Sequence, residues 1–199
     1  MPSLAFASKD PTEWWNVLEV NVRGPYNFIQ YGVSYTLYYA ARLSSPSFAV
    51  PELLKTKGQV VILNSLAGQV RVPLSSEYCT SKHAMLRFAE FVTLGECEIL
   101  LFCPPPIPHR FVEYPDIKVF SVDPGSVQTD MFEKFGAPVP PSSSIELSAS
   151  TIQYLTSGKA DYLSGRFVSS TWDLCDVERD WKEKIMAQNS PVSKLSLPA

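Results

Sequence analysis

Apolar and polar residues alternate along this chain with two different periods, one typical of helices and one of buried strands. Apolar side chains recur at helical spacing in four stretches, residues 10–30, 76–94, 145–156 and 176–188. Short apolar runs with the length of strands lie at residues 58–64 and 117–122. Strands that alternate with helices indicate an α/β fold, so we expect parallel strands with helices on their faces.

Capping and turn residues agree with these boundaries. Asp10 is a candidate N-cap, Pro11 suits the first helical turn and Glu13 lies three residues after the cap. Pro124 and Gly125 follow the second expected strand. They should therefore lie at its carboxyl end, where open α/β sheets bind ligands.

Length and charge restrict the class of protein. The chain has 199 residues, which suits one domain with a sizeable core, and a formal net charge of −3. Without a basic stripe, this balance argues against nucleic acid as a partner. The four cysteines show no CxxC spacing and the two histidines are isolated, so we expect no disulfide framework and no metal site.

Nothing in the sequence predicts a secretory signal or a membrane span. The N-terminus lacks a basic region followed by an apolar one. The uncharged run at residues 24–41 contains five tyrosines and several other polar residues, which is too polar for the ~20 mostly apolar residues of a spanning helix. We therefore expect a cytoplasmic protein with reduced thiols and no membrane partner.

Three residues around the first expected strand have the chemistry of a reaction centre. Ser65 follows that strand, and Tyr78 and Lys82 are four residues apart on the next helix, so both should share one helix face. A free tyrosine, with a pKa near ~10, exchanges protons poorly at neutral pH, but a nearby ammonium favours the phenolate. A lowering of the pKa by about three units needs roughly 4 kcal/mol, more than one surface lysine supplies. A cationic ring beside the pair would supply the rest.

These residues, together with two further motifs, resemble the short-chain dehydrogenase/reductase family. Asn21 lies upstream in Val20-Asn21-Val22-Arg23-Gly24, Tyr78 comes thirteen positions after Ser65, and Asp123-Pro124-Gly125-Ser126-Val127-Gln128-Thr129 lies downstream. A Tyr-x-x-x-Lys pattern alone occurs by chance in many helices, whereas the ordered set is specific. Without the resemblance, Asn21 would be read as a polar residue that bonds its own backbone.

The resemblance implies how each residue acts. Tyr78 would be the acid/base, Ser65 would orient the substrate oxygen, Lys82 would lower the tyrosine pKa and Asn21 would complete a proton relay through a water. Tyr78 and Lys82 would also hold the cofactor, NAD or NADP. The remaining cofactor contacts implied by the family are Pro124, Gly125, Val127 and Thr129.

The resemblance also implies a Rossmann-type, doubly wound parallel sheet, of which the N-terminal strands are missing. It makes residues 165–170 the last strand, so we expect three parallel strands in all. None of the nine glycines forms the G-x-G-x-x-G turn that would cradle a pyrophosphate. We therefore expect residues 1–188 to form the C-terminal half of such a domain, followed by a disordered tail at 189–199. The strand at 58–64 should then be an exposed edge that invites aggregation or pairing with another chain.

Two stretches fit neither the periodicity nor the family, at about residues 32–50 and 95–112. The second contains Cys103-Pro104-Pro105-Pro106, which stops both helix and sheet. Gly95-Glu96-Cys97 can be encoded with a donor-like GTGAGT, and Val112-Glu113 with an acceptor-like TAG. We interpret both stretches as translated introns, with ordinary surface insertions as the alternative. Genomic sequence and spliced transcript reads decide between the two.

Three functions remain open from sequence. The first is an NAD(P)-dependent oxidoreductase that interconverts an alcohol and a carbonyl on a small organic substrate. The second is an inactive, truncated product of a mis-spliced gene model, and the third is a dimerisation module without catalysis. The family implies a homo-oligomer through the helices at 10–30 and 76–94. The substrate is not readable, because its expected loop, residues 136–144, varies with the substrate in this family.

Overall fold

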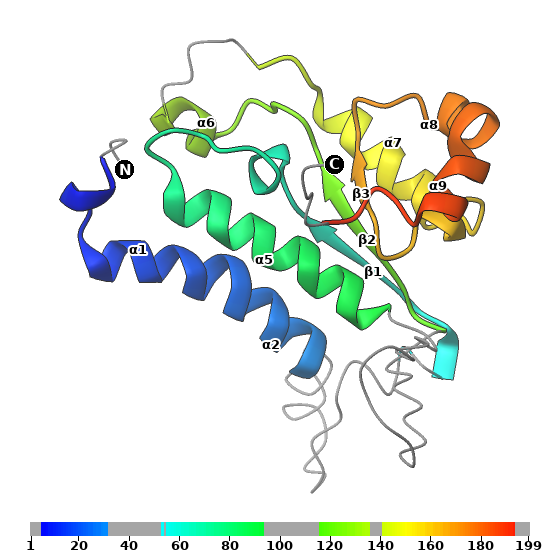
Figure 1. Ribbon diagram of the computed structural model, residues 1–199, viewed down its shortest axis with the longest axis horizontal. Helices are drawn as coiled ribbons and strands as arrows, with labels where there is room; N and C mark the ends of the chain where they lie inside the picture. Colours follow the sequence, from blue (N-terminus) through cyan, green and yellow to red (C-terminus); the bar gives the residue numbers. More distant parts are fainter. Residues whose placement is uncertain (1–4, 32–52, 54, 94–115, 136–140, 194–199) are drawn as a thin grey trace, which may run out of the picture.

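The structure is a computed structural model that describes residues 5–31, 53, 55–93, 116–135 and 141–193. Figure 1 shows a small parallel sheet between two groups of helices. The two predicted insertions, about 32–50 and 95–112, lie outside the described residues. The predicted loop at 136–144 is described only from residue 141.

The three predicted strands are confirmed and form one parallel sheet in the order β1-β2-β3. They are β1 (Gln59–Leu63), β2 (Lys118–Asp123) and β3 (Phe167–Ser169). Gln59 pairs with Lys118 at the start of the sheet, and Leu63 pairs with Val122 near its carboxyl edge. Because all three strands run the same way, their carboxyl ends meet at one edge of the sheet.

The predicted helices are present, with additional short ones between them. The longer elements are α1 (Pro11–Leu18), α2 (Gly24–Tyr31), α5 (Ser76–Val92), α7 (Ile145–Leu155) and α9 (Lys182–Gln188). The sequence analysis did not predict η1 (Phe6–Ser8), η3 (Leu66–Gly68), α6 (Asp130–Phe135) or η4 (Asp161–Leu163). The predicted C-terminal helix begins slightly earlier, with α8 (Leu174–Asp176) and the π-turn η5 (Val177–Trp181).

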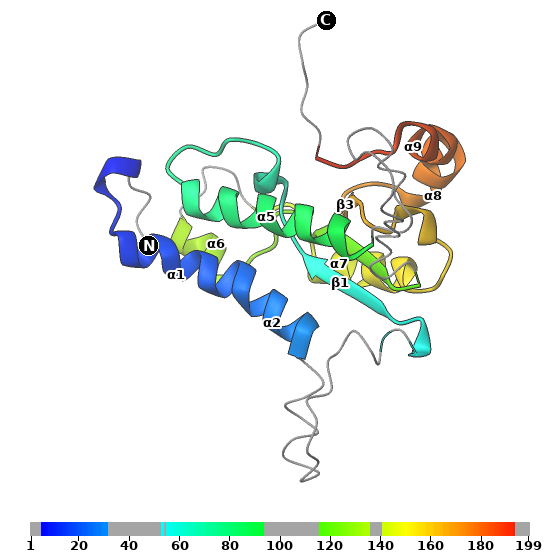
Figure 2. The same cartoon turned by 60° about the horizontal axis from the view of Figure 1, so that its bottom comes forward.

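Alternate residues of β2 enter two different cores. Val119 packs with Ile62, Met85 and Ala89, between the sheet and the helices α2 and α5. Phe120 and Val122 instead belong to a second cluster beneath α7, α8 and α9. Figures 1 and 2 show these two groups of helices on opposite sides of the sheet. Burial on both faces explains why consecutive residues of this strand, and not only alternate ones, are mostly apolar.

The N-terminal helix is one rod with a wider turn in its middle. Asp10 caps it as predicted, because its carboxylate accepts hydrogen bonds from the backbone N–H groups of Thr12 and Glu13. A π-turn, η2 (Glu19–Arg23), separates α1 from α2. Single π-turns inside helices are frequent at functional sites, and Asn21 lies within this one.

On its other side β1 has no paired strand among the described residues. Leu63 is 57% exposed, and an apolar groove of about 550 Å³ runs along the strand between Phe28, Ile29 and Leu53. This agrees with the predicted exposed edge at 58–64. No helix in the described part of the chain is long and apolar enough to cross a bilayer.

The first residues of the predicted tail differ from the expectation. Residues 189–193 cross from α9 over β3 to α5, where the Ser193 amide donates to the Glu90 carboxylate at 2.8 Å. The Phe167 amide donates to the Pro191 carbonyl at 3.2 Å, and the Arg166 guanidinium donates to the Asn189 side chain. Because these partners are polar side chains and backbone groups, the hydrophobic pattern gave no sign of the contact.

Candidate active site

Ser65 lies immediately beyond the carboxyl end of β1. Its backbone is extended and it caps η3, because its hydroxyl oxygen accepts a hydrogen bond from the Ala67 amide at 3.2 Å. The oxygen is thereby fixed as an acceptor, while the hydroxyl hydrogen is free to point at a neighbouring oxygen.

Tyr78 and Lys82 occupy one face of α5, as predicted. The Lys82 Nζ lies 5.6 Å from the centroid of the Tyr78 ring. The same ammonium donates a hydrogen bond to the Leu63 carbonyl oxygen at 3.0 Å, which ties α5 to the end of β1. Gly68 lets η3 approach the backbone of α5 closely, because a Cβ there would lie 2.9 Å from the Lys82 carbonyl carbon.

Burial is the main cause of the pKa shifts of Tyr78 and Lys82. It raises the pKa of the Tyr78 phenol above its ordinary value, the Ser65 hydroxyl acts against this by hydrogen bonding, and the negative charges of Asp123 and Cys79 raise the pKa further. Burial also lowers the pKa of the Lys82 ammonium. The phenol is therefore neutral at pH 7 in this structure, and an active phenolate needs a further positive charge nearby.

Asn21 contacts α5 through Ser81, and not through Tyr78 or Lys82. Its side-chain amide donates to the Ser81 hydroxyl at 3.0 Å, and that hydroxyl donates to the Tyr78 carbonyl oxygen at 2.8 Å. The structure thus joins Asn21 to the backbone of the tyrosine, and no hydrogen bond between the Asn21 and Lys82 side chains is among the described contacts.

The four predicted residues after β2 lie in one loop at the carboxyl edge of the sheet. Gly125 has φ = +78°, and a Cβ there would lie 2.3 Å from the Ser143 Oγ. Val127 forms an isolated β-bridge with Ser143. The Thr129 hydroxyl accepts the Phe132 amide at 3.2 Å and so caps α6. Pro124 is held through its carbonyl, which accepts the Ser148 hydroxyl at 3.0 Å.

Sequence reasoning missed several polar residues that surround this site. Asn64, Ser81, Ser121 and Asp123 are all buried, with at most 8% of each residue exposed. Asp123 accepts a hydrogen bond from the Ser169 hydroxyl at 3.2 Å. For Asn64, Ser121 and Asp123 the available signal was a polar residue inside or directly after an apolar strand, because such groups remain buried only with partners. Ser81, on α5, had no such signal.

In the described part of the chain, the side chains that commonly bind metals do not form a cluster. No group of three or more His, Cys, Asp or Glu side chains there could hold a metal ion. His83 has a structural partner, because its Nδ1 lies 2.8 Å from the Gly68 carbonyl oxygen. Cys79 and Cys175 are free thiols.

Comparison with known proteins adds a consistent family signal. Residues 2–95 match a family model described as short chain dehydrogenase. The chain is 33% identical over 175 residues to the short chain dehydrogenase pigC of Monascus ruber, an alignment that covers 83% of this chain and 46% of the relative. It is 30% identical over 196 residues to the short chain dehydrogenase citE of Monascus ruber, covering 96% of this chain and 55% of that relative.

Solved structures show the same fold. An acetoin dehydrogenase, YohF from Salmonella typhimurium, superposes with a TM-score of 0.56 at 21% identity, covering 83% of this chain and 56% of that one. A structure of ElxO with NADP bound gives a TM-score of 0.58 at 18% identity, covering 83% and 59%. The chain thus spans about half the length of the curated relatives it matches.

Proposed function

Because this chain belongs to the short-chain dehydrogenase/reductase family, we propose that it carries the proton-transfer part of an NAD(P)-dependent oxidoreductase. The reaction would interconvert an alcohol and a carbonyl on a small organic substrate. The observation that carries this proposal is the grouping of Ser65, Tyr78 and Lys82 at the carboxyl end of β1.

Each of these side chains would have a separate task. Tyr78 would give its proton to the carbonyl oxygen during reduction, or take the alcohol proton during oxidation. Ser65, whose hydroxyl oxygen accepts from the Ala67 amide, would donate its hydroxyl hydrogen to the same substrate oxygen. Lys82 would lower the pKa of the phenol, and Asn21 would complete the proton relay beyond the lysine.

The residues fit the nicotinamide end of NAD or NADP. The cofactor supplies or accepts the hydride. Tyr78 and Lys82 would contact it from α5. Pro124, Gly125, Val127 and Thr129 would contact it from the loop after β2, which lies at the same edge of the sheet. Support comes from this placement and from the NADP-bound neighbour.

The competing proposal is a chain without catalysis. It is supported by the absence of a G-x-G-x-x-G turn among the nine glycines, because such a turn holds the pyrophosphate. A non-catalytic dimerisation module would need the same fold without cofactor binding. Both alternatives predict a folded protein that binds no dinucleotide.

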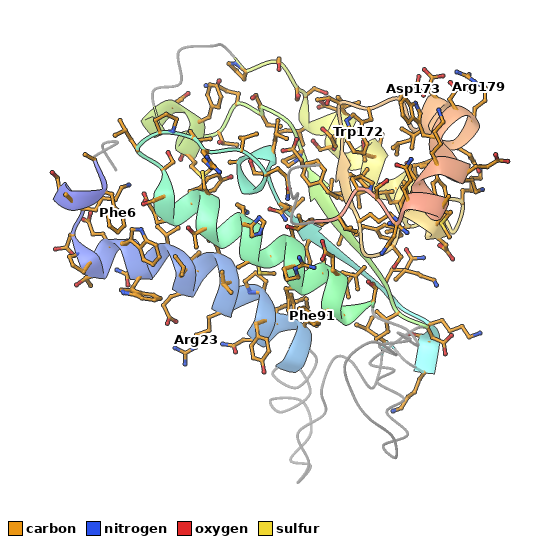
Figure 3. The ribbon with its side chains drawn as sticks, viewed as in Figure 1. Phe6, Arg23, Phe91, Trp172, Asp173 and Arg179 are labelled. Atoms are coloured by element: carbon orange, nitrogen blue, oxygen red, sulfur yellow. The ribbon has the colours of Figure 1, made fainter. Side chains whose placement is uncertain are left out.

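We also propose that α1, α2 and α5 form a homodimer face. A groove of about 630 Å³ separates the N-terminal rod from α5 and is lined by Trp15, Leu18, Tyr26 and Phe88, among others. Trp15 is 61% exposed and Phe91 is 52% exposed. Figure 3 shows Phe91 on α5 beside α2. Apolar surface of this kind is typical of an interface. A Phe91→Glu substitution should lower the mass measured by light scattering, whereas Met186→Glu, on α9, should leave it unchanged.

The cofactor test is a fluorescence or calorimetric titration of the purified chain with NADH and with NADPH. Micromolar binding is expected, weakened at least about tenfold by Lys82→Met through the loss of its charge and hydrogen bond. Lys184→Met is the matched control, because that lysine lies over Trp181 on α9. A folded chain that binds neither dinucleotide contradicts the enzyme proposal. If the cofactor binds, Tyr78→Phe should abolish turnover of small ketones while leaving binding largely intact.

A further inference from the structure

One buried side chain connects Ser65 to the neighbouring strand. The Asn64 Nδ2 donates to the Ser121 hydroxyl oxygen on β2 at 2.8 Å, and the Asn64 Oδ1 accepts the Ser65 backbone N–H at 2.9 Å. Asn64 is 3% exposed and Ser121 is fully buried. The side chain therefore spans from the middle of the sheet to the backbone of the predicted catalytic serine.

These contacts lie where the strand ladder ends. The Asn64 backbone N–H still donates to the Val122 carbonyl at 2.6 Å, which continues the pairing of β1 with β2. The next amide, that of Ser65, bonds to the Asn64 side chain. The chain can then turn into η3 without leaving a buried N–H unpaired. The direction in which Ser65 leaves the sheet thus depends on the Asn64 amide.

Asn64 and Ser121 are polar residues inside a largely apolar sheet, and their burial is expected to lower stability unless their polar atoms are paired. Burying an amide and a hydroxyl is unfavourable unless both are hydrogen-bonded, and apolar side chains of similar size would avoid the requirement. Both groups are bonded here, and the acceptor that Asn64 offers goes to Ser65. Such a network fixes one geometry, which is what a catalytic side chain requires.

We propose that Asn64, anchored by Ser121, is a positioning residue that holds the Ser65 hydroxyl in the orientation from which it meets the Tyr78 phenol and a substrate oxygen. The catalytic importance of this arrangement rests on the proposed function. The geometric part, from Ser121 through Asn64 to the Ser65 backbone, can be tested without cofactor or substrate through the ionisation of Tyr78.

Tyr78 itself supplies the readout. Burial raises the pKa of this phenol, and hydrogen bonding by the Ser65 hydroxyl is the contribution that lowers it, against the smaller electrostatic effects of Asp123 and Cys79. If Ser65 is displaced, the pKa of Tyr78 should rise. A role of Asn64 confined to sheet stability would lower the unfolding free energy and leave that pKa unchanged.

The experiment measures the ionisation of Tyr78 by NMR of ¹³Cζ-labelled tyrosine, with Tyr78→Phe to assign the signal. Asn64→Ala should raise the pKa of Tyr78 by as much as Ser65→Ala does, and the double variant should raise it no further. Ser121→Ala should shift it in the same direction by a smaller amount. Ser170→Ala is the matched control, because Ser170 is 1% exposed at the end of β3 and its hydroxyl has no hydrogen-bond partner among the described residues.

A folded Asn64→Ala variant with an unshifted Tyr78 signal overturns the proposal. If that variant does not fold, Ser121→Ala decides, and an unchanged Tyr78 pKa in it overturns the proposal equally. An equal shift in Ser170→Ala would also overturn it, because the effect would then be a general loosening of the sheet. A positive result together with no binding of NADH or NADPH would contradict the proposed function and leave the positioning role intact.

Discussion

The side-chain amide of Asn21 donates a hydrogen bond to the hydroxyl of Ser81 at 3.0 Å, across a sequence separation of 60 residues. Ser81 is fully buried and donates in turn to the Tyr78 carbonyl oxygen. The π-turn of the N-terminal rod is thus attached to the turn of α5 that carries the tyrosine. This contact gives Asn21 a structural role in addition to the relay proposed for it.

Substitution of Asn21 should lower the unfolding free energy, whereas substitution of another asparagine of the same rod should not. Asn21→Ala is expected to lower the unfolding free energy by about 1 kcal/mol, the typical value of one partly buried hydrogen bond. Asn27→Ala is the control, because Asn27 is an exposed residue of α2 and gains the same helix propensity. Urea unfolding measures both variants. Equal stabilities would show that the Asn21–Ser81 contact contributes nothing.

A pH-dependent contribution is expected from the ion pair between η1 and α5. The Lys9 Nζ lies 2.6 Å from the Glu77 Oε2, and their side chains are only 11% and 17% exposed. Lys9 also donates to the Leu74 carbonyl at 2.8 Å. Because the pair is largely buried, Lys9→Met should lower the unfolding free energy by about 2 kcal/mol at pH 7. This is less than the loss expected when one partner of a fully buried ion pair is removed.

At low pH, the difference in unfolding free energy between wild type and Lys9→Met should change in a defined direction. Urea unfolding at several pH values measures it. Burial alone would raise the pKa of Glu77. Hydrogen bonds from Lys9, the Glu77 backbone amide and Ser76, together with the charge of Lys9, outweigh burial, and the pKa lies below the ordinary 4.5. A lowered carboxyl pKa stabilises the fold above the unfolded value, and this contribution is lost as the pH falls through the folded value. The difference between wild type and Lys9→Met should therefore shrink below about pH 4.5. A constant difference down to pH 2 would contradict this assignment.

The sequence predicted β1, β2 and the longer helices well, because each of these elements has its own apolar pattern. Ser65, Tyr78 and Lys82 were predictable in the same way, since their spacing on a strand end and a helix brings them together. Asn21 was assigned to the right helix, but its partner Ser81 was not foreseen. That contact joins two helices through polar groups, and hydrophobic periodicity carries no information about such pairs.

The bridge through Asn64 was missed for a related reason. From sequence, Asn64 is one polar residue after an apolar run, and Ser121 is one polar residue within another. Only the register that places Leu63 opposite Val122 brings the two side chains together. Register between strands more than 50 residues apart depends on the packing of both faces, which no local pattern specifies.

Substitutions at two glycines should distinguish the cost of a strained backbone from the cost of a steric clash. Gly125 and Gly158 have φ values of +78° and +84°, but a Cβ at Gly158 meets nothing within 4 Å, whereas one at Gly125 would lie 2.3 Å from the Ser143 Oγ. Gly158→Ala should cost about 1–2 kcal/mol for the left-handed backbone. Gly125→Ala should cost about 1 kcal/mol or more beyond that, because Ser143 and Thr171 must move. Thermal unfolding compares the two, and equal losses would mean that the loop after β2 adapts freely.

At high pH, the unfolding free energy should depend on the ionisation of Tyr154. Its hydroxyl donates to the Glu178 Oε2 at 3.0 Å, and burial followed by this hydrogen bond raises the pKa of Tyr154 to about 12. A raised folded pKa stabilises the protein below the ordinary value of 10, and the contribution is lost as the pH rises through the folded value. Tyr154→Phe should therefore be less stable than wild type at pH 8, and the difference should diminish between pH 10 and 12.

Comparison of variants isolates this effect, because the lysines that also titrate in this range are common to both proteins and cancel in the difference. Tyr26→Phe is the control, since the Tyr26 ring is 45% exposed and packs against Phe88. Urea unfolding at pH 8, 10 and 11.5 is the measurement. If the difference between Tyr154→Phe and wild type stays constant over this range, the Glu178 carboxylate does not hold the phenol in its protonated form.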